Sequence, residues 1–354
     1  MNSRHGLRIS TPDGSGQAVH PDVVHVPDGF LGYAYWMGCT PYPFAEDRFE
    51  NPVIRVSHDG VDWMPFPGAP DPLVEAPVNG SWHHADTDIV LHNGTIYVFY
   101  ISTNREAAET VFSFICSADG VRWSAPHEIY RGAWGVSPAV VVVDVSKWSM
   151  WYVVRDSLAR AQVSFVYRRD GPAAVALGRP EPCDLRIPGH VVWHLDVIRS
   201  GPRFEALVTA FPSGTNPSRS RLFYTESDDG RVFRLLSESP LIRPTLLGWD
   251  NRMIYRSSFV RCQDNSYRIW YSAASWGMRC GIGLVEGPID RLAAVATEAH
   301  SKEPSALRRC QEDAVGLAKY LALRVLPAPI YGWLLKTRAR LRTSFRSTQP
   351  DPRQ

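Results

Sequence analysis

Histidine and aspartate recur together at three places in the 354-residue sequence, two residues apart each time. The three sets are His20-Pro21-Asp22, His84-Ala85-Asp86 with Asp88 two residues further on, and His194-Leu195-Asp196. Residues two apart in an extended strand point to the same side, so each set presents imidazole and carboxylate groups in one direction. Such groups suit general acid–base catalysis, nucleophilic attack by a carboxylate and the binding of a divalent cation.

A lone histidine or aspartate at this kind of position is usually a turn or capping residue. The threefold recurrence at equivalent places sets these residues apart, and it requires structural elements that repeat along the chain. One series of such elements consists of turns, in which glycine follows an apolar-rich segment: Gly60, Gly120, Gly171, Gly230 and Gly287. Four of the five are preceded by aspartate, and Asp-Gly favours the positive φ of a tight hairpin.

A second series consists of apolar strands that are each followed by a polar turn and an aromatic-rich strand. These strands start at Asp22, Asp88, Ala139, Asp196 and Ser258, at spacings of 66, 51, 57 and 62 residues. Two interleaved series of five hairpins build five four-stranded antiparallel sheets. The sequence therefore predicts an all-β fold, a five-bladed β-propeller, with a long β-sandwich as the alternative.

The apolar residues, 44% of the chain, are enough to fill a sizeable core. The aromatic residues, 11% of the chain, are typical of a fold with many short strands. The predicted organisation is an N-terminal segment (1–17), the propeller (18–297), a helical, basic amphipathic tail (298–346) and a disordered end (347–354). From residue 331 onward six basic side chains face one acidic one, so the net charge of +2 divides into +5 for this end and −3 for the rest. This nearly balanced charge argues against a propeller domain that functions by binding nucleic acid.

The six cysteines are dispersed and form no Cys-x-x-Cys pair, which argues against a zinc ribbon or a disulfide framework. The first residues lack the apolar core of a secretory signal, and no apolar run reaches the ~18 residues that a spanning helix needs. We therefore expect a cytoplasmic protein.

Aromatic side chains precede several strand starts, where loops between blades reach the mouth of the central funnel. These are Trp82, Trp134, Trp193 and Trp249. Flat aromatic faces beside carboxylates suit a sugar ring, whereas about two thirds of the twelve Trp are expected to pack between sheets. The residues expected to contact a glycan or oligosaccharide are His20, Glu50, Trp82, His84, Asp86, Trp134, Trp193, His194, Trp249 and Arg256.

The layout of strands, turns and aspartates resembles the five-bladed propeller glycoside hydrolases, the superfamily of arabinanases, xylosidases, fructosidases and levansucrases, over residues 18–295. In that superfamily an aspartate on the first strand of blade one is base or nucleophile, and the resemblance assigns this role to Asp22. A second aspartate tunes or orients, and an acid, usually glutamate, lies in a later blade. The segment from His20 to Trp63 also looks like one shared by uncharacterised hydrolase-like propellers, in which Glu50 returns toward the funnel mouth.

The sequence departs from this pattern because no glutamate occupies an equivalent strand start. The resemblance then leaves the acid role to Asp196, with Asp88 or Asp86 as modulator, or else to Glu50. Arg256, at the start of the fifth blade, is expected to hold a substrate carboxylate, to lower the pKa of an aspartate, or to act as a structural ion-pair partner.

Three hypotheses for the function follow. The first is a glycoside hydrolase that needs no cofactor and uses Asp22, Asp88 and Asp196. The second is a carbohydrate-binding propeller without catalysis, which the missing glutamate favours. The third is a single divalent cation in the central channel, since the histidines and aspartates offer nitrogen and oxygen ligands.

The stretch from Ile330 to Arg346 combines aliphatic and aromatic side chains with five of the six basic residues of this end. An interfacial helix that settles on anionic lipid has this composition. We therefore expect either peripheral contact with the inner face of a membrane or a helix that packs on the propeller with a solvated basic face.

Overall fold

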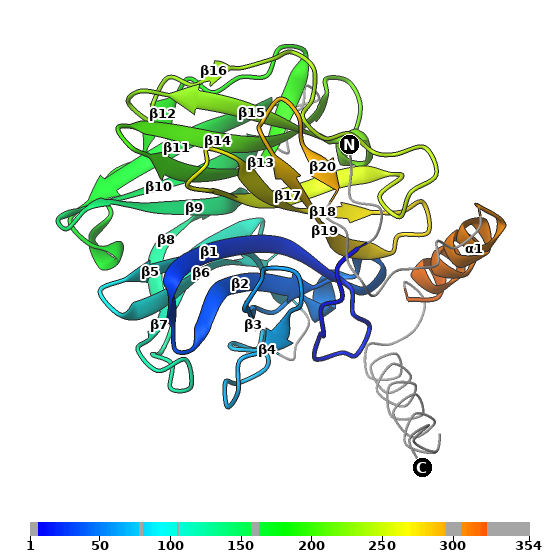
Figure 1. Cartoon of the computed structure of the whole chain (residues 1–354), viewed down its shortest axis with the longest axis horizontal. Helices are drawn as coiled ribbons and strands as arrows, with labels where there is room; N and C mark the ends of the chain where they lie inside the picture. Colours follow the sequence, from blue (N-terminus) through cyan, green and yellow to red (C-terminus); the bar gives the residue numbers. More distant parts are fainter. Residues whose placement is uncertain (1–5, 78–80, 105, 157–162, 295–305, 324–354) are drawn as a thin grey trace.

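The computed structural model describes residues 6–77, 81–104, 106–156, 163–294 and 306–323. In these residues the strands form five four-stranded antiparallel sheets (Figure 1). The first strands of the sheets contact one another in the order β1, β5, β9, β13, β17 and back to β1. This closed ring is a five-bladed β-propeller, so the fold predicted from the repeats is confirmed.

Each blade is a simple meander of four strands along the chain. Blade one contains β1 (Ala18–Phe30), β2 (Tyr33–Pro41), β3 (Val53–Ser57) and β4 (Met64–Pro65). Blade two contains β5 (Trp82–His92), β6 (Thr95–Asn104), β7 (Glu109–Ser117) and β8 (His127–Ala133). Blade three contains β9 (Gly135–Asp144), β10 (Lys147–Asp156), β11 (Val163–Gly171) and β12 (Glu181–Cys183).

Blade four contains β13 (His190–Ser200), β14 (Arg203–Pro212), β15 (Arg221–Ser227) and β16 (Arg234–Leu235), and blade five contains β17 (Met253–Arg261), β18 (Tyr267–Ala274), β19 (Cys280–Gly287) and β20 (Ala293–Ala294). Short 3-10 turns interrupt the loops: η1 (Pro43–Ala45), η2 (Asp47–Phe49), η3 (Ala174–Ala176) and η4 (Pro217–Arg219). One helix, α1 (Ala306–Leu323), follows the last blade.

The repeated Asp-Gly turns join the third strand of a blade to its short fourth strand. In blade one the Gly60 N–H donates to Ser57 Oγ (2.9 Å), and Asp59 Oδ1 accepts from Val61 N–H (2.8 Å). Gly60 has φ +73°, and a Cβ there would lie 2.9 Å from the Trp270 ring of blade five. Glycine therefore serves both the positive φ and the close approach of the neighbouring blade.

The core lies between adjacent blades rather than at the centre. One apolar cluster joins blades three and four, with Trp151 and Phe223 among its buried members. Another joins blades five and one, and it includes Ile9 of the N-terminal segment. That segment also pairs with blade five, where the Leu7 N–H donates to Ile282 O (2.6 Å). Packing between blades thus leaves the channel to polar side chains.

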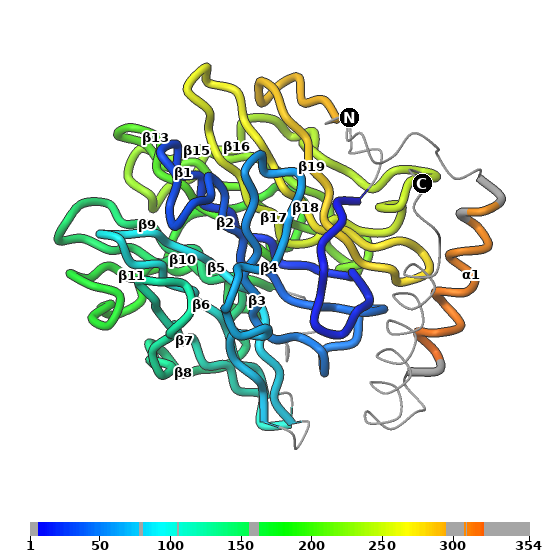
Figure 2. The backbone as a smooth tube through the Cα atoms, turned by 60° about the horizontal axis from the view of Figure 1, so that its bottom comes forward, coloured from blue at the N-terminus to red at the C-terminus, as the bar shows by residue number. Residues whose placement is uncertain are grey.

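Helix α1 lies on the outside of the propeller, on the opposite side of the molecule from β11 (Figures 1 and 2). It approaches so closely that a Cβ on Gly316 would lie 2.4 Å from Gly277 O. Lys319 lies over the Phe44 ring of η1, at 5.4 Å from its centroid. None of the described helices is long and apolar enough to cross a membrane. The basic stretch from Ile330 to Arg346 lies outside the described residues.

Candidate functional site

The first strand of each blade is irregular near its start, and this decides where the predicted residues point. The pairing register shifts between Val19 and Asp22 in β1 and between Ala85 and Asp88 in β5, and β9, β13 and β17 have similar shifts. His20 and Asp86 adopt φ of 54° and 51° within these shifts. A bulge of this kind breaks the alternation of side chains along a strand.

The histidine and aspartate of each set consequently do not point into one pocket, contrary to the expectation from strand alternation. His20, Asp86 and His194 meet in one group, and Asp22, Asp88 and Asp196 meet in a second group. We call the first group the His–Asp–His cluster and the second the aspartate triad. His84 joins neither group.

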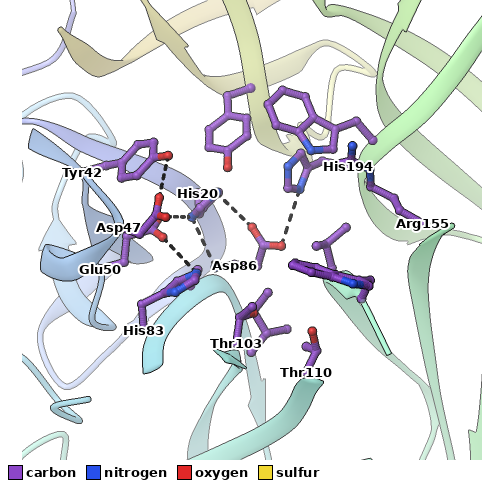
Figure 3. A pocket seen from close by; sticks show the side chains of 16 residues that line it. His20, Tyr42, Asp47, Glu50, His83, Asp86, Thr103, Thr110, Arg155 and His194 are labelled. Atoms are coloured by element: carbon purple, nitrogen blue, oxygen red, sulfur yellow. Dashed lines mark hydrogen bonds and ion pairs between the residues drawn. The ribbon is translucent and has the colours of Figure 1, made fainter. Parts of the chain in front are cut away.

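The His–Asp–His cluster is buried, and one nitrogen or oxygen of each member lies within 4.8 Å of the others. His20 Nε2 is 3.0 Å from Asp86 Oδ1, and His194 Nδ1 is 3.6 Å from Asp86 Oδ2 (Figure 3). His20 Nε2, Asp86 Oδ1 and His194 Nε2 make no hydrogen bond within the described part of the chain. Two imidazoles and one carboxylate that converge in this way offer nitrogen and oxygen ligands to a shared ion.

Neighbouring side chains hold the cluster in place. His20 Nδ1 lies 2.9 Å from Thr40 Oγ1, and His194 Nδ1 lies 2.6 Å from Ser137 Oγ. The Ser137 N–H donates to Asp86 Oδ2 (2.8 Å). The Asp86 backbone N–H donates to His20 Nδ1 (3.3 Å), so the proton of a neutral His20 lies on Nε2, facing Asp86 Oδ1, and a bound cation would displace it.

The charge states suit a cation. Burial raises the pKa of Asp86, but the neighbouring His20 and His194 lower it by more. The pKa of Asp86 therefore lies well below its usual range. Burial lowers the pKa of His194 to about 3. An ionised carboxylate and a neutral imidazole are the forms that bind a metal. The residues present therefore fit a divalent cation with mixed nitrogen and oxygen ligands.

The cluster forms one side of a cavity of about 370 Å³. Its lining comprises His20, Tyr42, Asp47, Glu50, His83, Ala85, Asp86, Ile101, Thr103, Thr110, Trp134, Val136, Arg155, Trp193, His194 and Tyr255. Figure 3 shows Asp47 and Glu50 on one side of the cluster and Arg155 on the other. The cavity has the size and the mixed lining of a small-molecule site.

Glu50 is an acidic group of the cavity that lies beside the cluster. Its side chain is buried, with Oε1 3.5 Å from His20 Nδ1 and Oε2 3.7 Å from His83 Nε2. It follows η2, in the loop between β2 and β3. A carboxylate at this place is within reach of a group bound at the cluster.

Aromatic rings surround the cluster on the side of blades four and five. The Tyr255 ring lies 4.6 Å from His20 and 4.6 Å from Trp193, centroid to centroid. Trp134 and Trp193, both expected at the funnel mouth, line the cavity. Burial raises the pKa of Tyr255 well above its usual range, so its hydroxyl keeps its proton and remains a donor.

Four residues expected to contact a glycan do not line this cavity. His84 Nδ1 lies 2.9 Å from Ser102 Oγ, and burial lowers the pKa of His84 to about 4. Trp249 stacks on Tyr271, with centroids 5.7 Å apart. Trp82 begins β5 and is partly buried, and Arg256 is buried among the aspartates.

The aspartate triad, to which the catalytic roles were assigned, also lies outside the cavity lining. Asp22 Oδ2 accepts from Ile89 N–H (2.7 Å), and Asp88 Oδ2 accepts from Val140 N–H (3.1 Å). In both pairs the side chain of one blade accepts from the backbone of the next. Asp196 bonds in the same way to the backbone of Phe259. The triad thus ties neighbouring blades together.

Arg256 is the cation of the triad. It is fully buried, with Nη2 3.2 Å from Asp88 Oδ1 and 4.0 Å from Asp22 Oδ1. It also donates to Thr87 O and, at 2.7 Å, to Pro138 O. These contacts fit the structural ion pair among the roles expected for Arg256. Burial raises the pKa of all three aspartates, that of Asp196 to about 8.

Sequence reasoning missed Tyr42, Asp47, His83, Arg155 and Tyr255. Two of these lie in the loop between β2 and β3, which carries no repeat, and Arg155 lies at the end of β10, a second strand. Ser137, which contacts His194 and Asp86, was also missed. Its position could have been found from the repeat, because Ser137 occupies in blade three the same place as His20 in blade one and Asp86 in blade two.

The fold and the site define a five-bladed propeller with a buried His–Asp–His cluster beside a partly aromatic cavity. No known family profile matches the sequence. Among curated proteins the chain is similar to an A type blood N-acetyl-alpha-D-galactosamine deacetylase of Flavonifractor plautii, with 26% identity over 313 residues. The match covers 73% of this chain and 40% of that protein, so the chain spans about 40% of the length of this curated relative.

Solved structures resemble the chain over most of its length. An N-acetylgalactosamine deacetylase from F. plautii, in complex with blood group B trisaccharide, matches with a TM-score of 0.75 and 22% identity, over 81% of this chain and 94% of that one. A xylan beta-1,4-xylosidase from Bacillus halodurans C-125 matches with a TM-score of 0.60 and 15% identity, over 84% and 61%. A thermostable family-43 glycoside hydrolase matches with a TM-score of 0.59 and 12% identity, over 84% and 98%. The resemblance to propeller glycoside hydrolases is confirmed as one of fold, and these similar proteins are carbohydrate-processing enzymes.

Proposed function

We propose that this chain removes the acetyl group from an N-acetylated amino sugar of a glycan, at the His–Asp–His cluster. The observation that carries the proposal is the convergence of His20, Asp86 and His194 at the cavity, with the carboxylate of Glu50 beside them. The similarity to an N-acetylgalactosamine deacetylase supports the choice of bond.

His20, Asp86 and His194 would hold one divalent cation, which when bound supplies a Lewis acid that lowers the pKa of water and polarises a carbonyl. Glu50 accepts the proton of the attacking water, whose oxygen bonds to the acetyl carbon. Tyr255 donates its hydroxyl proton as a hydrogen bond to the carbonyl oxygen, which becomes negative in the transition state. The C–N bond then breaks, Glu50 returns the proton to the leaving nitrogen, and acetate and a free amine result.

The remaining lining suits a sugar. Trp134 and Trp193 offer apolar faces to the ring, and Thr103 and Thr110 offer hydroxyls for hydrogen bonds. A glycan is accordingly the proposed partner. If the same pocket binds glycan without turnover, the chain is the carbohydrate-binding propeller considered above.

Glycosidic hydrolysis by the aspartate triad is the second candidate, and one observation favours it. The raised pKa of Asp196 keeps a carboxylic acid protonated at neutral pH beside Asp22, as a general acid requires. Two observations argue against glycosidic hydrolysis by the triad. All three aspartates lie outside the cavity lining, and their oxygens accept hydrogen bonds from backbone N–H groups of the next blade.

An assay for acetate and for new reducing ends separates these functions. The protein, supplied with Mn²⁺ or Zn²⁺, is incubated with oligosaccharides ending in N-acetylgalactosamine or N-acetylglucosamine and with nitrophenyl glycosides. We expect acetate and free amine in equal amounts, and a loss of about 10²–10⁴-fold in Glu50→Gln, because the general base is removed. Glu238→Gln, on the surface, is the control. Reducing ends without acetate would support the second candidate, and neither product would support binding alone.

A further inference from the structure

Arg155 stands apart from the other arginines that are buried in this propeller. Arg55, Arg168 and Arg256 each pair with a carboxylate, at 3.0, 2.7 and 3.2 Å, and Arg169 donates to Gly178 O at 2.8 Å. The guanidinium of Arg155 is half-buried and lines the cavity, yet no carboxylate or hydrogen-bond acceptor pairs with it among the residues that the structure describes. Among the described residues that line the cavity, it is the one lysine or arginine.

The backbone fixes Arg155 at this place. It lies near the end of β10, and its N–H donates to Trp134 O (3.2 Å), the residue just before β9. Burial lowers the pKa of Arg155 from its usual value, yet a guanidinium remains charged throughout the physiological range. A charge partly withdrawn from water is unfavourable unless it is paired, and the described residues supply no carboxylate to Arg155, so an anion bound in the cavity would stabilise it.

The charges of the cavity are separated across the cluster. Asp47 and Glu50 lie on one side, and Arg155 lies on the other side, next to His194 (Figure 3). An anionic ligand is repelled from the Glu50 side and attracted to the Arg155 side. This polarity gives a bound sugar only one favourable orientation when the sugar carries a negative group.

We propose that Arg155 binds an anionic substituent of the glycan, a carboxylate or a sulfate, and that the natural substrate is an acidic glycan. The inference rests on the proposed function only for the position of the acetylated sugar at the cluster. A guanidinium presents parallel N–H donors that match two oxygens of either group. Arg155 is thus a specificity residue, and neutral glycans lack the group that it pairs with.

Binding to the full chain tests this inference independently of turnover. Quenching of tryptophan fluorescence is followed with three probes: a glucuronyl-N-acetylgalactosamine disaccharide, N-acetylgalactosamine 6-sulfate, and the neutral galactosyl-N-acetylgalactosamine. We expect at least one charged probe to bind about tenfold or more tightly than the neutral one, since hydrogen bonds to charged groups are the stronger kind. The tighter of the two charged probes identifies carboxylate or sulfate as the ligand.

In Arg155→Gln the preference should disappear while affinity for the neutral probe is retained, and Arg155→Lys should keep part of it. Arg186→Gln is the control, because Arg186 is exposed and pairs with Asp184 at 2.9 Å outside the cavity. Equal affinity for charged and neutral probes in the unaltered protein, or a preference that persists in Arg155→Gln, would overturn the inference. A charged preference without acetate release would leave it intact and reject the deacetylation.

Discussion

Asp86→Asn is expected to reduce acetate release by at least about 10²-fold, a larger loss than the 10–100-fold typical of residues that only support metal ligands. The amide keeps an oxygen that accepts from Ser137 N–H, so the fold is retained. It removes the negative charge that His20 and His194 face at 3.0 and 3.6 Å. Acetate is measured under saturating metal and substrate, with the thermal midpoint as a check on folding.

Asp28→Asn is the matched control, because Asp28 is exposed and lies toward the far end of β1 from the cluster. Acetate release in this variant should equal that of the unaltered chain. Full activity in Asp86→Asn would remove the cluster from the reaction and with it the proposed function.

The second large effect is expected on stability. Asp88→Ala leaves the buried guanidinium of Arg256 without its 3.2 Å partner and the Val140 N–H without its 3.1 Å acceptor. Breaking a buried ion pair by removing one partner typically lowers the free energy of unfolding by about 3–5 kcal/mol. Denaturant unfolding measures this loss, and Asp88→Asn should lose less because its amide oxygen still accepts from Val140.

Asp28→Ala, at an exposed position of β1, should leave the unfolding free energy within about 0.5 kcal/mol of the unaltered chain. The result bears on the role of the whole triad. An Asp88→Ala protein of unchanged stability that has lost hydrolysis of a glycosidic bond would restore the catalytic interpretation of Asp22, Asp88 and Asp196.

The propeller could be predicted because its repeat is local. Each Asp-Gly turn and each apolar strand is a short pattern, and five copies in register leave few folds open. The ring of first strands also brought His20, Asp86 and His194 to one end of the channel, as their shared position at the strand starts implied.

The direction of these side chains was not predictable from the same patterns. His20 and Ser137 precede proline, and such residues favour extended backbone, yet their φ angles are 54° and 55°. Positive φ at a residue other than glycine costs about 1–3 kcal/mol and persists where surrounding contacts impose it. The contacts here join different blades, such as Ser137 to His194, and no short segment encodes them.

Loop residues escaped prediction for a related reason. Tyr42, Asp47 and Glu50 belong to an irregular connection between β2 and β3, and only Glu50 was anticipated. Their position depends on packing, including the contact of Phe44 with Lys319 of α1. Pairs distant in sequence, like these, become visible only once the chain has folded.

Calorimetric titration of the metal-depleted full chain with Mn²⁺ shows whether the His–Asp–His cluster binds a metal. We expect one ion bound per chain, with binding abolished in His194→Ala and unchanged in His84→Ala. His84 is a strict comparison, because it belongs to the same sequence pattern but bonds to Ser102 away from the cavity. Absence of binding by the unaltered chain, or equal binding by the two variants, would contradict a metal-binding His–Asp–His cluster.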